Sequence, residues 1–458
     1  MTQPLSRRNF LKNSAVAATS AFVLPRFSIG SSANAGHKLN VACIGIGGMG
    51  HYAVSAAARD ENLVALCDVD WRGKGERWDE GNPIDIANEH PDAKRFSDFR
   101  EMLDDMGDKI DVVMVSTPDH THFAATMAAM EKGKHVFVQK PLAHNIWQVR
   151  TLQKAMHEYG VTTVMGNQGH TFEGMRLIVE WYQAGILGDV EEVHCWTDRP
   201  RLPWFKEQET LSPKGQPVPD KLDWDLWQGP VKNRGYSSEY VPVLWRGWWD
   251  YGVGSLGDIG CHCLDAPFWA LELGMPSKVD VELDEKPNGI YTPMSAHVIY
   301  HFPARGDKPP VKLHWYEGDQ VPKEIAGVRD LPANGMLMIG SEETILSDDM
   351  RPRSPTLWPR ERMSKYKDVL KKRPLPRVKG GPAEELFTAL HGGAEPGSNF
   401  DYAAPLTEVV LLGGLAIRTG KNIEWDAEKM RITNNRKLNK LVKEPARKGW
   451  RYGEGLWT

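Results

Sequence analysis

The sequence predicts an α/β chain in which a doubly wound parallel sheet precedes an α+β domain with a large open, mixed and mostly antiparallel sheet. The first observation behind this is an alternation of apolar runs and helix-like segments from Lys38 to about Gly166. The second is a change of pattern after Gly166, where runs of alternating polar and apolar residues begin. A chain of 458 residues is long enough for two such domains.

Short apolar runs in the N-terminal part are typical of buried parallel strands. They are Val41–Ile44, Leu63–Cys67, Val112–Ser116, His135–Val138 and Val161–Met165. Helix-like segments lie between them, at His51–Arg59, Phe123–Lys132 and Ile146–Tyr159. Ligands of such sheets bind beyond the carboxyl ends of the strands. We therefore expect the functional site among the residues that follow these runs.

The second part of the chain begins with an amphipathic helix at Met175–Ala184. Strand-like runs follow at Val190–Thr197, Ser277–Leu283, Ala296–Phe302 and Val311–Tyr316. Their alternation indicates strands with one buried face, which favours an antiparallel-rich or mixed sheet.

Two stretches differ in composition from this pattern of strands and helices. Residues 199–250 are rich in Trp, Pro and Gly, and their indoles either stack on sugar faces or fill the core. Residues 349–382 are basic and rich in proline. A solvated surface loop is the plain interpretation of the basic stretch, and an arm that contacts another subunit is the alternative.

The run Val41–Ile44 is followed by Gly45, Gly47 and Gly50 in the pattern G-x-G-x-x-G, and the next strand-like run ends at Asp68. Gly45 permits a tight turn, Gly47 lets the backbone approach a pyrophosphate, and Gly50 lets the helix pack closely on the sheet. Asp68 is placed to bind both ribose hydroxyls of NAD, which makes NADP the less favoured cofactor. A tight glycine turn without a ligand is the alternative, but the ordered elements predict a dinucleotide-binding Rossmann domain.

The first residues are typical of an export signal. Ser6–Lys12 carries a twin arginine, Ala15–Leu24 is weakly apolar, and Ala33–Ala35 forms an A-x-A cleavage site. The apolar stretch is too short to span a bilayer, so we expect no membrane insertion. Residues 1–35 are thus predicted to be a twin-arginine signal peptide that sends the folded protein to the periplasm or otherwise out of the cell. Because free NAD is not expected there, the prediction includes a cofactor held tightly enough to survive transport.

The rest of the chain is predicted to divide into a Rossmann domain at residues 36–166 and a substrate-binding and oligomerisation domain at residues 167–458. The net charge of −4 becomes more negative without the basic signal, and no basic stripe dominates, which argues against nucleic acid as a partner. The five cysteines are an odd number, and we interpret them as free. Cys261-His262-Cys263 has no second ligand pair at zinc-like spacing, so no metal site is predicted.

Three residues carry the predicted chemistry. Lys140 stands in Gln139-Lys140-Pro141, directly after an apolar run, where the proline holds the turn extended. Asp258 and His262 are four residues apart in a glycine-rich stretch and share one face if that stretch is helical. The carboxylate can then orient an imidazole that serves as a general base for a hydroxyl. The plainer alternatives are a surface lysine, a helix-capping aspartate and a core histidine.

Together, the glycine fingerprint, the Lys-Pro after the strand and D-x-x-x-H in a glycine-rich helix start resemble the Gfo/Idh/MocA oxidoreductases. The resemblance covers the whole chain after the signal. It implies catalytic roles for Lys140, Asp258 and His262, NAD as cofactor, and a homodimer or homotetramer. Gln139 replaces the usual glutamate of the family's E-K-P motif, which removes one acidic neighbour of the lysine.

The expected cofactor-binding set is Gly45, Gly47, Gly48, Met49, Gly50, Asp68, Thr117, Pro118, His122, Gln139 and Lys140. Candidate substrate-binding residues are His170, Trp245 and Arg246, although an ordinary loop histidine explains His170 equally well.

Three functions remain open on the sequence. The favoured one is an exported NAD(P)-dependent oxidoreductase that oxidises or reduces a ring hydroxyl or ketone of a sugar, glycoside or cyclitol. The second is an NAD-dependent, redox-assisted glycosidase or lyase that acts through a transient keto-sugar. The third is a binding module that holds the nucleotide only structurally, against which the set of Lys140, Asp258 and His262 argues.

Overall fold

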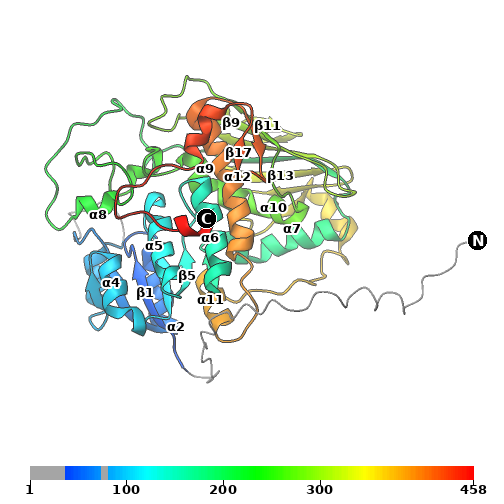
Figure 1. Cartoon of the computed structure of the whole chain (residues 1–458). Coiled ribbons are helices and arrows are strands. Elements are labelled where there is room, and N and C mark those ends of the chain that lie inside the picture. The colour runs from blue at the N-terminus through cyan, green and yellow to red at the C-terminus, as the bar shows by residue number, and fades with distance from the viewer. Residues whose placement is uncertain (1–36, 74–80) are drawn as a thin grey trace, which may run out of the picture. The chain divides into compact units, whose positions relative to one another are not determined.

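Six parallel strands and the helices between them form the N-terminal part of the fold (Figure 1). The structure, a computed structural model, describes residues 37–73 and 81–458, so the predicted signal at residues 1–35 lies outside the described residues. The strands are β1 (Asn40–Ile44), β2 (Asn62–Cys67), β3 (Lys94–Phe96), β4 (Val112–Val115), β5 (His135–Val138) and β6 (Thr163–Met165). Their order, β3-β2-β1-β4-β5-β6, is that of a doubly wound nucleotide-binding sheet, and the predicted Rossmann fold is confirmed.

The helices of this part follow the predicted alternation. They are α2 (Gly50–Asp60), α3 (Pro83–Glu89), α4 (Phe99–Met106), α5 (Asp119–Glu131) and α6 (Ile146–Tyr159). Asn145 and Gln148 form a capping box at the start of α6, and Gly160 ends the helix with a φ of 62°. Strand β3 was not predicted, because its residues are few and mostly polar and exposed.

A nine-stranded sheet forms the second part, in the order β15-β14-β13-β7-β10-β9-β8-β16-β17. Only β7 and β10 pair in parallel, so the predicted mixed and mostly antiparallel sheet is confirmed. Its strands are β7 (Val190–Thr197), β8 (Lys278–Glu282), β9 (Ala296–Phe302), β10 (Val311–Glu317), β13 (Asn334–Gly340), β14 (Thr344–Ser347), β15 (Thr356–Trp358), β16 (Ile423–Asp426) and β17 (Arg431–Ile432). A separate hairpin consists of β11 (Glu324–Ile325) and β12 (Val328–Arg329).

Helices of the second part connect the two sheets. They are α7 (Glu173–Gln183), α8 (Trp224–Gln228), α9 (Gly254–Cys263), α10 (Asp265–Leu271), α11 (Pro382–Leu390) and α12 (Phe400–Thr419). Short 3-10 turns are η1 (Gly107–Lys109), η2 (Gln168–Thr171), η3 (Leu244–Gly247), η4 (Gly318–Gln320), η5 (Arg360–Tyr366), η6 (Arg436–Leu441) and η7 (Glu454–Trp457). Helix α12 packs against α6, α9 and β8, so it fixes α9 between the two sheets.

Helix α12 is also the one helix of the described residues that is long and apolar enough to cross a membrane. Within the fold, 83% of its apolar window is buried, which is the pattern of a core helix. A buried ion pair ties it to α6, because the Glu408 carboxylate accepts a hydrogen bond of 2.7 Å from Arg150 Nη2 and one of 3.0 Å from Trp425 Nε1. The apolar face of α12 is therefore occupied by the protein itself.

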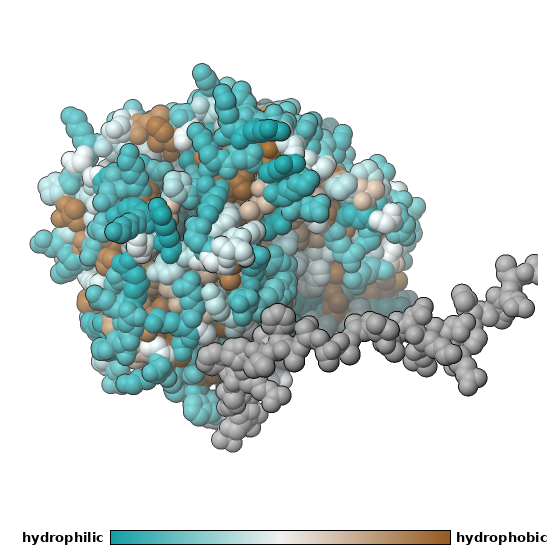
Figure 2. Space-filling view, viewed as in Figure 1, coloured by the Kyte–Doolittle hydropathy of each residue, from teal (hydrophilic) through white to brown (hydrophobic). Residues whose placement is uncertain are grey.

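Apolar residues on the surface are scattered among hydrophilic ones on the face that Figure 2 shows. The exposed large apolar residues of the described chain come from many separate segments: Met49, Tyr52, Leu202, Val218, Ile290, Met294, Trp358 and Trp457.

All five cysteines are buried and free, as predicted. Burial raises the pKa of Cys43 to about 12, so this thiol stays protonated. Within residues 37–73 and 81–458 there is no cluster of three His, Cys, Asp or Glu side chains that could hold a metal ion.

Candidate active site

The glycine turn after β1 is shaped by close backbone contacts. Gly45 has a φ of +75°, and a Cβ there would lie 2.8 Å from the backbone nitrogen of Thr117. A Cβ on Gly50 would lie 1.9 Å from the carbonyl oxygen of Gly45. Any larger residue at either position would push the turn away from the sheet. The turn thus needs both glycines.

The carboxylate of Asp68 lies against this turn. Its Oδ2 accepts a hydrogen bond of 2.8 Å from the N–H of Ile46 and one of 3.4 Å from the N–H of Gly47, and its Oδ1 accepts one of 2.9 Å from Asp70. The end of β2 therefore presents an acid where the ribose of a dinucleotide binds in this fold.

A single crevice runs from the glycine turn to Lys140 and Asp258. It is lined by nine of the predicted cofactor-binding residues: Gly45, Gly47, Gly48, Met49, Asp68, Thr117, Pro118, Gln139 and Lys140. Two predicted residues do not line it. Gly50 packs on Gly45, and the buried ring of His122 lies between the carbonyl oxygens of Pro141 and Thr117, at 2.8 and 2.7 Å. His122 thus braces the strand ends instead of facing the crevice.

The Trp-rich residues 199–250 form one wall of the crevice. Trp227 and Trp245 line it, and Trp450 from the C-terminal segment joins them. A β-bridge between Asp70 and Leu222 fastens this wall to the chain that follows β2. Indoles of residues 199–250 also pack on one another in a separate aromatic cluster, so this stretch forms a small core as well as a wall.

Lys140 and Asp258 form an ion pair at the end of the crevice. Lys140 Nζ lies 2.9 Å from Asp258 Oδ1 and 2.5 Å from the Asp258 carbonyl oxygen. The carboxylate also binds Arg199, and Arg246 Nε lies 3.4 Å from Oδ1. Burial would raise the pKa of Asp258, but Lys140, Arg199 and Arg246 hold it well below its usual range. Asp258 thus supplies the acidic partner that Gln139 does not provide to Lys140.

His262 follows Asp258 by one turn of α9, as its spacing predicts, but Asn167 rather than Asp258 orients its ring. The Asn167 Nδ2 donates hydrogen bonds of 2.8 Å to Cys261 O and Asp265 Oδ2, which leaves its Oδ1 to face His262 Nδ1 at 2.6 Å. Because an amide oxygen only accepts, Nδ1 carries the proton and Nε2 has the free lone pair. The role that the sequence suggested for Asp258 toward this ring is therefore corrected.

The Nε2 atom of His262 lies 3.3 Å from Arg351 Nη2, which can donate to it. The imidazole has no exposed surface. Burial, followed by Arg351 and Lys140, holds the pKa of His262 well below its usual range. The ring is therefore neutral at neutral pH and able to accept a proton.

His170 does not belong to this site. Its Nδ1 lies 3.1 Å from both carboxylate oxygens of Asp265, and its ring stacks on Trp269 with centroids 4.8 Å apart. The side chain is 1% exposed. His170 is thus a buried residue whose partner is Asp265, and it does not line the crevice, whereas Trp245 and Arg246 do.

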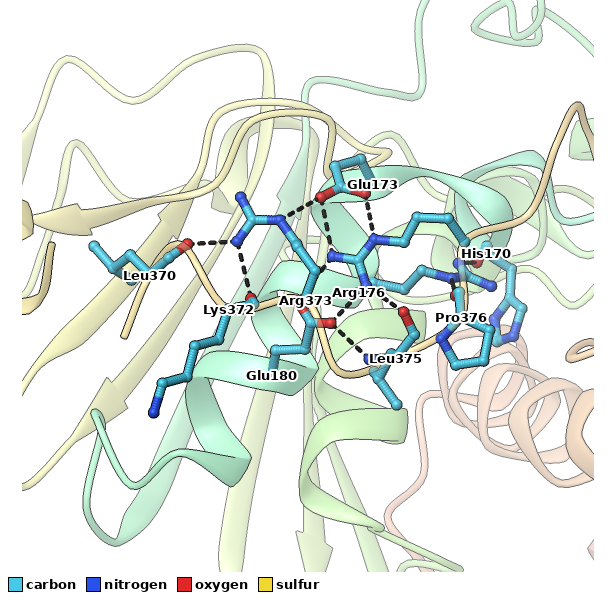
Figure 3. A network of polar contacts seen from close by, with 10 residues as sticks. His170, Glu173, Arg176, Glu180, Leu370, Lys372, Arg373, Leu375 and Pro376 are labelled. Carbon is cyan, nitrogen blue, oxygen red and sulfur yellow. Dashed lines mark hydrogen bonds and ion pairs between the residues drawn. The ribbon is translucent and has the colours of Figure 1, made fainter. Parts of the chain in front are cut away.

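The basic stretch at residues 349–382 lies at the surface, and most of its residues are exposed, as the plainer interpretation predicts, but ion pairs hold it on α7. Arg373 and Arg377 bind Glu173 on α7, and Arg377 also binds Glu180 (Figure 3). The N–H of Leu375 donates a hydrogen bond of 2.9 Å to Glu180. These contacts hold the stretch on α7, and its first part carries Arg351 to His262.

Sequence reasoning thus missed three residues of the site: Asn167, Arg199 and Arg351. Asn167 stands directly after the predicted run at Val161–Met165 and Gly166, and that position was a usable signal. Arg199 and Arg351 carry no local signal, because only the fold brings them near α9.

The described fold and crevice define a dinucleotide-binding oxidoreductase. Residues 39–167 match the family model of the Gfo/Idh/MocA oxidoreductase family's NAD-binding Rossmann fold, and residues 200–297 match the model of its C-terminal alpha/beta domain. The Rossmann model thus matches the first part of the chain, and the C-terminal model matches the second part. Over these residues the chain matches the Gfo/Idh/MocA oxidoreductase family.

Curated relatives match over parts of their length. An uncharacterized oxidoreductase of Streptococcus pneumoniae is 32% identical over 135 residues, which are 30% of this chain and 35% of the relative. The scyllo-inositol 2-dehydrogenase (NAD(+)) of Bacillus subtilis is 29% identical over 28% of this chain and 36% of its own. A glycosyl hydrolase family 109 protein of Solibacter usitatus is 29% identical over 40% and 44%. The chain thus spans less than half the length of these relatives.

Solved structures share the fold over most of their length. The WlbA dehydrogenase of Chromobacterium violaceum, in complex with NADH and UDP-GlcNAcA, is 16% identical with a TM-score of 0.58, over 85% of this chain and 97% of its own. Levoglucosan dehydrogenase in complex with NADH is 17% identical with a TM-score of 0.53, over 83% and 98%. At this identity the likeness establishes the fold.

Proposed function

We propose that this protein is an NAD-dependent oxidoreductase that oxidises or reduces a ring hydroxyl or ketone of a sugar, glycoside or cyclitol. The observation that carries the proposal is that Lys140 and Asp258 line the crevice that begins at the glycine turn, with His262 one helical turn after Asp258 on α9. A binding module that held the nucleotide only structurally would need neither a cation nor a neutral imidazole there.

The residues present fit a dinucleotide. Gly45, Gly47 and Gly48 of the turn line the crevice and have no side chains that could block a pyrophosphate, and Asp68 lies at the ribose position. An acid at the end of β2 favours NAD over NADP, because it repels a 2′-phosphate. When bound, the nicotinamide supplies the hydride chemistry.

The chain's own residues handle the proton and the charge. His262 Nε2 carries the lone pair that accepts the proton of the substrate hydroxyl, once Arg351 gives up its contact. Lys140 Nζ donates a hydrogen bond to the same substrate oxygen and stabilises its developing negative charge. Asp258 holds Lys140 in place and keeps it charged, and Asn167 holds the imidazole in the tautomer that can act as a base.

We also propose that the protein is exported with its cofactor in place. The twin-arginine pattern supports export. The wall made by Trp227, Trp245 and Trp450 supports slow release of the nucleotide, because these indoles line the crevice that would hold it. The bound cofactor would then be reoxidised by a second carbonyl substrate, which predicts ping-pong kinetics. The homodimer or homotetramer stays a prediction from the family resemblance.

The test combines nucleotide analysis with a carbohydrate panel. Absorbance and mass of the nucleotide released on denaturation give its identity and redox state. Sugars, glycosides and inositols are then added to the purified protein, and reduction of bound NAD is followed. We expect at least one of them to reduce the nucleotide in the wild type and not in His262→Ala. No bound nucleotide and no reduction by any member would reject the proposal.

A redox-assisted glycosidase or lyase is the second candidate. Two relatives favour it by name: the glycosyl hydrolase family 109 protein, and the 2,7-anhydro-N-acetylneuraminate hydratase of Escherichia coli, which is 31% identical over 22% of this chain and 27% of its own. Nitrophenyl glycosides separate the candidates when no NAD is added. Release of nitrophenol without net ketone product would favour this second function.

A further inference from the structure

Cations outnumber carboxylates around Asp258 and His262. Lys140, Arg199 and Arg246 all contact Asp258, and Arg351 contacts the neighbouring His262. The nearby Asp119 adds little negative charge, because burial raises its pKa to about 7 despite the opposing effect of Lys140 and Arg246. At neutral pH the four cations therefore face the ionised Asp258, the partly protonated Asp119, and Asp349, whose carboxylate also pairs with Arg353. The site has positive charge that the protein itself does not balance.

Arg351 is the cation whose hydrogen-bonding capacity is not fully used. Its Nε is buried and has no hydrogen-bond partner among the described residues. The nearest acid along the strap, Asp349, accepts a hydrogen bond of 3.3 Å from the backbone N–H of Arg351, and its carboxylate pairs with Arg353. The guanidinium instead faces His262 Nε2, which is a neutral acceptor. A buried guanidinium edge without an anion costs free energy, which an acceptor from outside would recover.

Close packing against α7 and the residues before it holds Arg351 in place. We call residues 349–377 the strap. A Cβ on Gly174 of α7 would lie 2.4 Å from Pro352 O, and a Cβ on Gly169 would lie 3.4 Å from Arg351 Cβ. Arg353 stacks on Phe172, with its guanidinium carbon 4.4 Å from the ring centroid. The far end of the strap is fixed to α7 by the ion pairs in Figure 3.

We propose that the substrate is a sugar acid whose carboxylate binds the guanidinium of Arg351 while its reacting hydroxyl lies at His262 Nε2. This inference rests on the proposed function of the same site. The pyrophosphate of the cofactor does not account for Arg351, because its expected position is the glycine turn, where the backbone of β1 and α2 receives it. A planar carboxylate matches the fork of a guanidinium, with two parallel hydrogen bonds.

The geometry also links recognition to catalysis. Arg351 Nη2 and the hydroxyl proton of the substrate compete for the same lone pair of His262 Nε2. A substrate carboxylate draws the guanidinium to itself and leaves Nε2 open for the hydroxyl. A neutral sugar has no carboxylate for Arg351, so the guanidinium stays hydrogen-bonded to His262 Nε2. Discrimination should therefore be visible in kcat as well as in KM.

The experiment uses matched pairs of methyl glycosides of glucuronate and glucose, galacturonate and galactose, and mannuronate and mannose. Binding to the nucleotide-loaded protein is measured by calorimetry, and reduction of bound NAD is measured with the same compounds. We expect at least one acid to bind and to react about tenfold to a hundredfold better than its neutral partner, as a charge-assisted bidentate contact implies.

Three variants identify the source of the preference. Arg351→Gln should bind acid and neutral sugar equally, and Arg351→Lys should keep part of the preference because it keeps the charge but not the fork. Arg360→Gln is the matched control, because Arg360 is exposed on the same strap, and it should behave as the wild type. Thermal unfolding of each variant shows that it is folded.

The outcomes separate this inference from the proposed function. Reduction of NAD by neutral sugars as fast as by acids, or an undiminished preference in folded Arg351→Gln, overturns the sugar-acid assignment and leaves the oxidoreductase intact. Arg351-dependent binding of an acid without reduction of NAD supports the assignment and rejects the oxidoreductase. Binding of no acid by the loaded wild type also overturns the assignment.

Discussion

Asn167 Oδ1 lies 2.6 Å from His262 Nδ1, and this contact fixes which nitrogen of the imidazole can act as a base. The amide is itself held by two hydrogen bonds of 2.8 Å to Asp265 and Cys261 O, so it does not rotate freely. The catalytic proton acceptor is therefore set by a residue that follows β6, not by the carboxylate one turn earlier on α9.

Replacing Asn167 by Leu should lower turnover about tenfold to a hundredfold, the usual effect of losing a residue that orients a functional imidazole. The ring would lose the acceptor that keeps the proton on Nδ1. Bound nucleotide should be unchanged, because Asn167 does not line the crevice. Single-turnover reduction of NAD measures the first effect and nucleotide content the second. Wild-type turnover in a folded Asn167→Leu protein would contradict the assigned role.

Removing the charge of Arg351 should change the pH dependence of the reaction. Burial is the largest cause of the lowered pKa of His262, and Arg351 is the next. Without that cation the imidazolium is less disfavoured, so the pKa of His262 rises. The base is then protonated at a higher pH, and the acidic limb of kcat/KM moves to higher pH in Arg351→Gln. A profile of kcat/KM against pH checks this, with the exposed Arg360→Gln as the control that should not move the limb.

Catalysis and cofactor binding should separate in two variants. His262→Ala should lose turnover by a factor of about a hundred to ten thousand while still carrying nucleotide, because it removes a general base and leaves the glycine turn intact. Asp68→Ala should weaken nucleotide retention and leave the Lys140–Asp258 contact in place. Nucleotide content and hydride transfer are measured for both. Near-normal turnover in His262→Ala would make Lys140 the next candidate base.

Asp258→Asn should destabilise the fold by about 3–5 kcal/mol, because it leaves Lys140, Arg199 and Arg246 buried without their common partner. The lowered pKa of Asp258 means that its contribution is fully present above the unfolded value of about 3.9 and is lost as pH falls through the folded value. The difference between wild type and variant should therefore be constant near neutrality and shrink in acid.

Urea unfolding at several pH values measures this difference. Asp60→Asn is the matched control, because Asp60 pairs with Arg59 at the exposed surface and should contribute less than about 1 kcal/mol. Equal stability losses in the two variants would show that the buried cations do not depend on Asp258.

Trp450→Leu should speed the loss of nucleotide. Trp450 lines the crevice, and the Arg100 guanidinium stacks on it at 4.3 Å. A smaller side chain opens the wall without removing any residue of the glycine turn. Nucleotide content after extended dialysis measures retention. Trp457→Leu serves as the control, because Trp457 is 40% exposed and lies outside the crevice lining.

The sequence by itself determined the elements that depend on local pattern. The glycine fingerprint, the apolar runs and the strand-like alternation are local, and they predicted the Rossmann sheet and the mixed second sheet. The spacing of Asp258 and His262 placed both on one helix because an α-helix repeats every 3.6 residues. Lys140 was predictable because it follows a strand whose carboxyl end lines the crevice.

Only the tertiary structure decided which side chains meet. Lys140 and Asp258 are 118 residues apart, Asn167 and His262 are 95 apart, and His262 and Arg351 are 89 apart. Such contacts depend on how α9, β6 and the strap pack, and no local periodicity encodes them. His170 and His262 are both buried, and their partners distinguish them, because Asp265 contacts His170 whereas Asn167 and Arg351 contact His262. The charge of the site is therefore a property of the packing, since three of its cations come from segments that the sequence alone could not bring together.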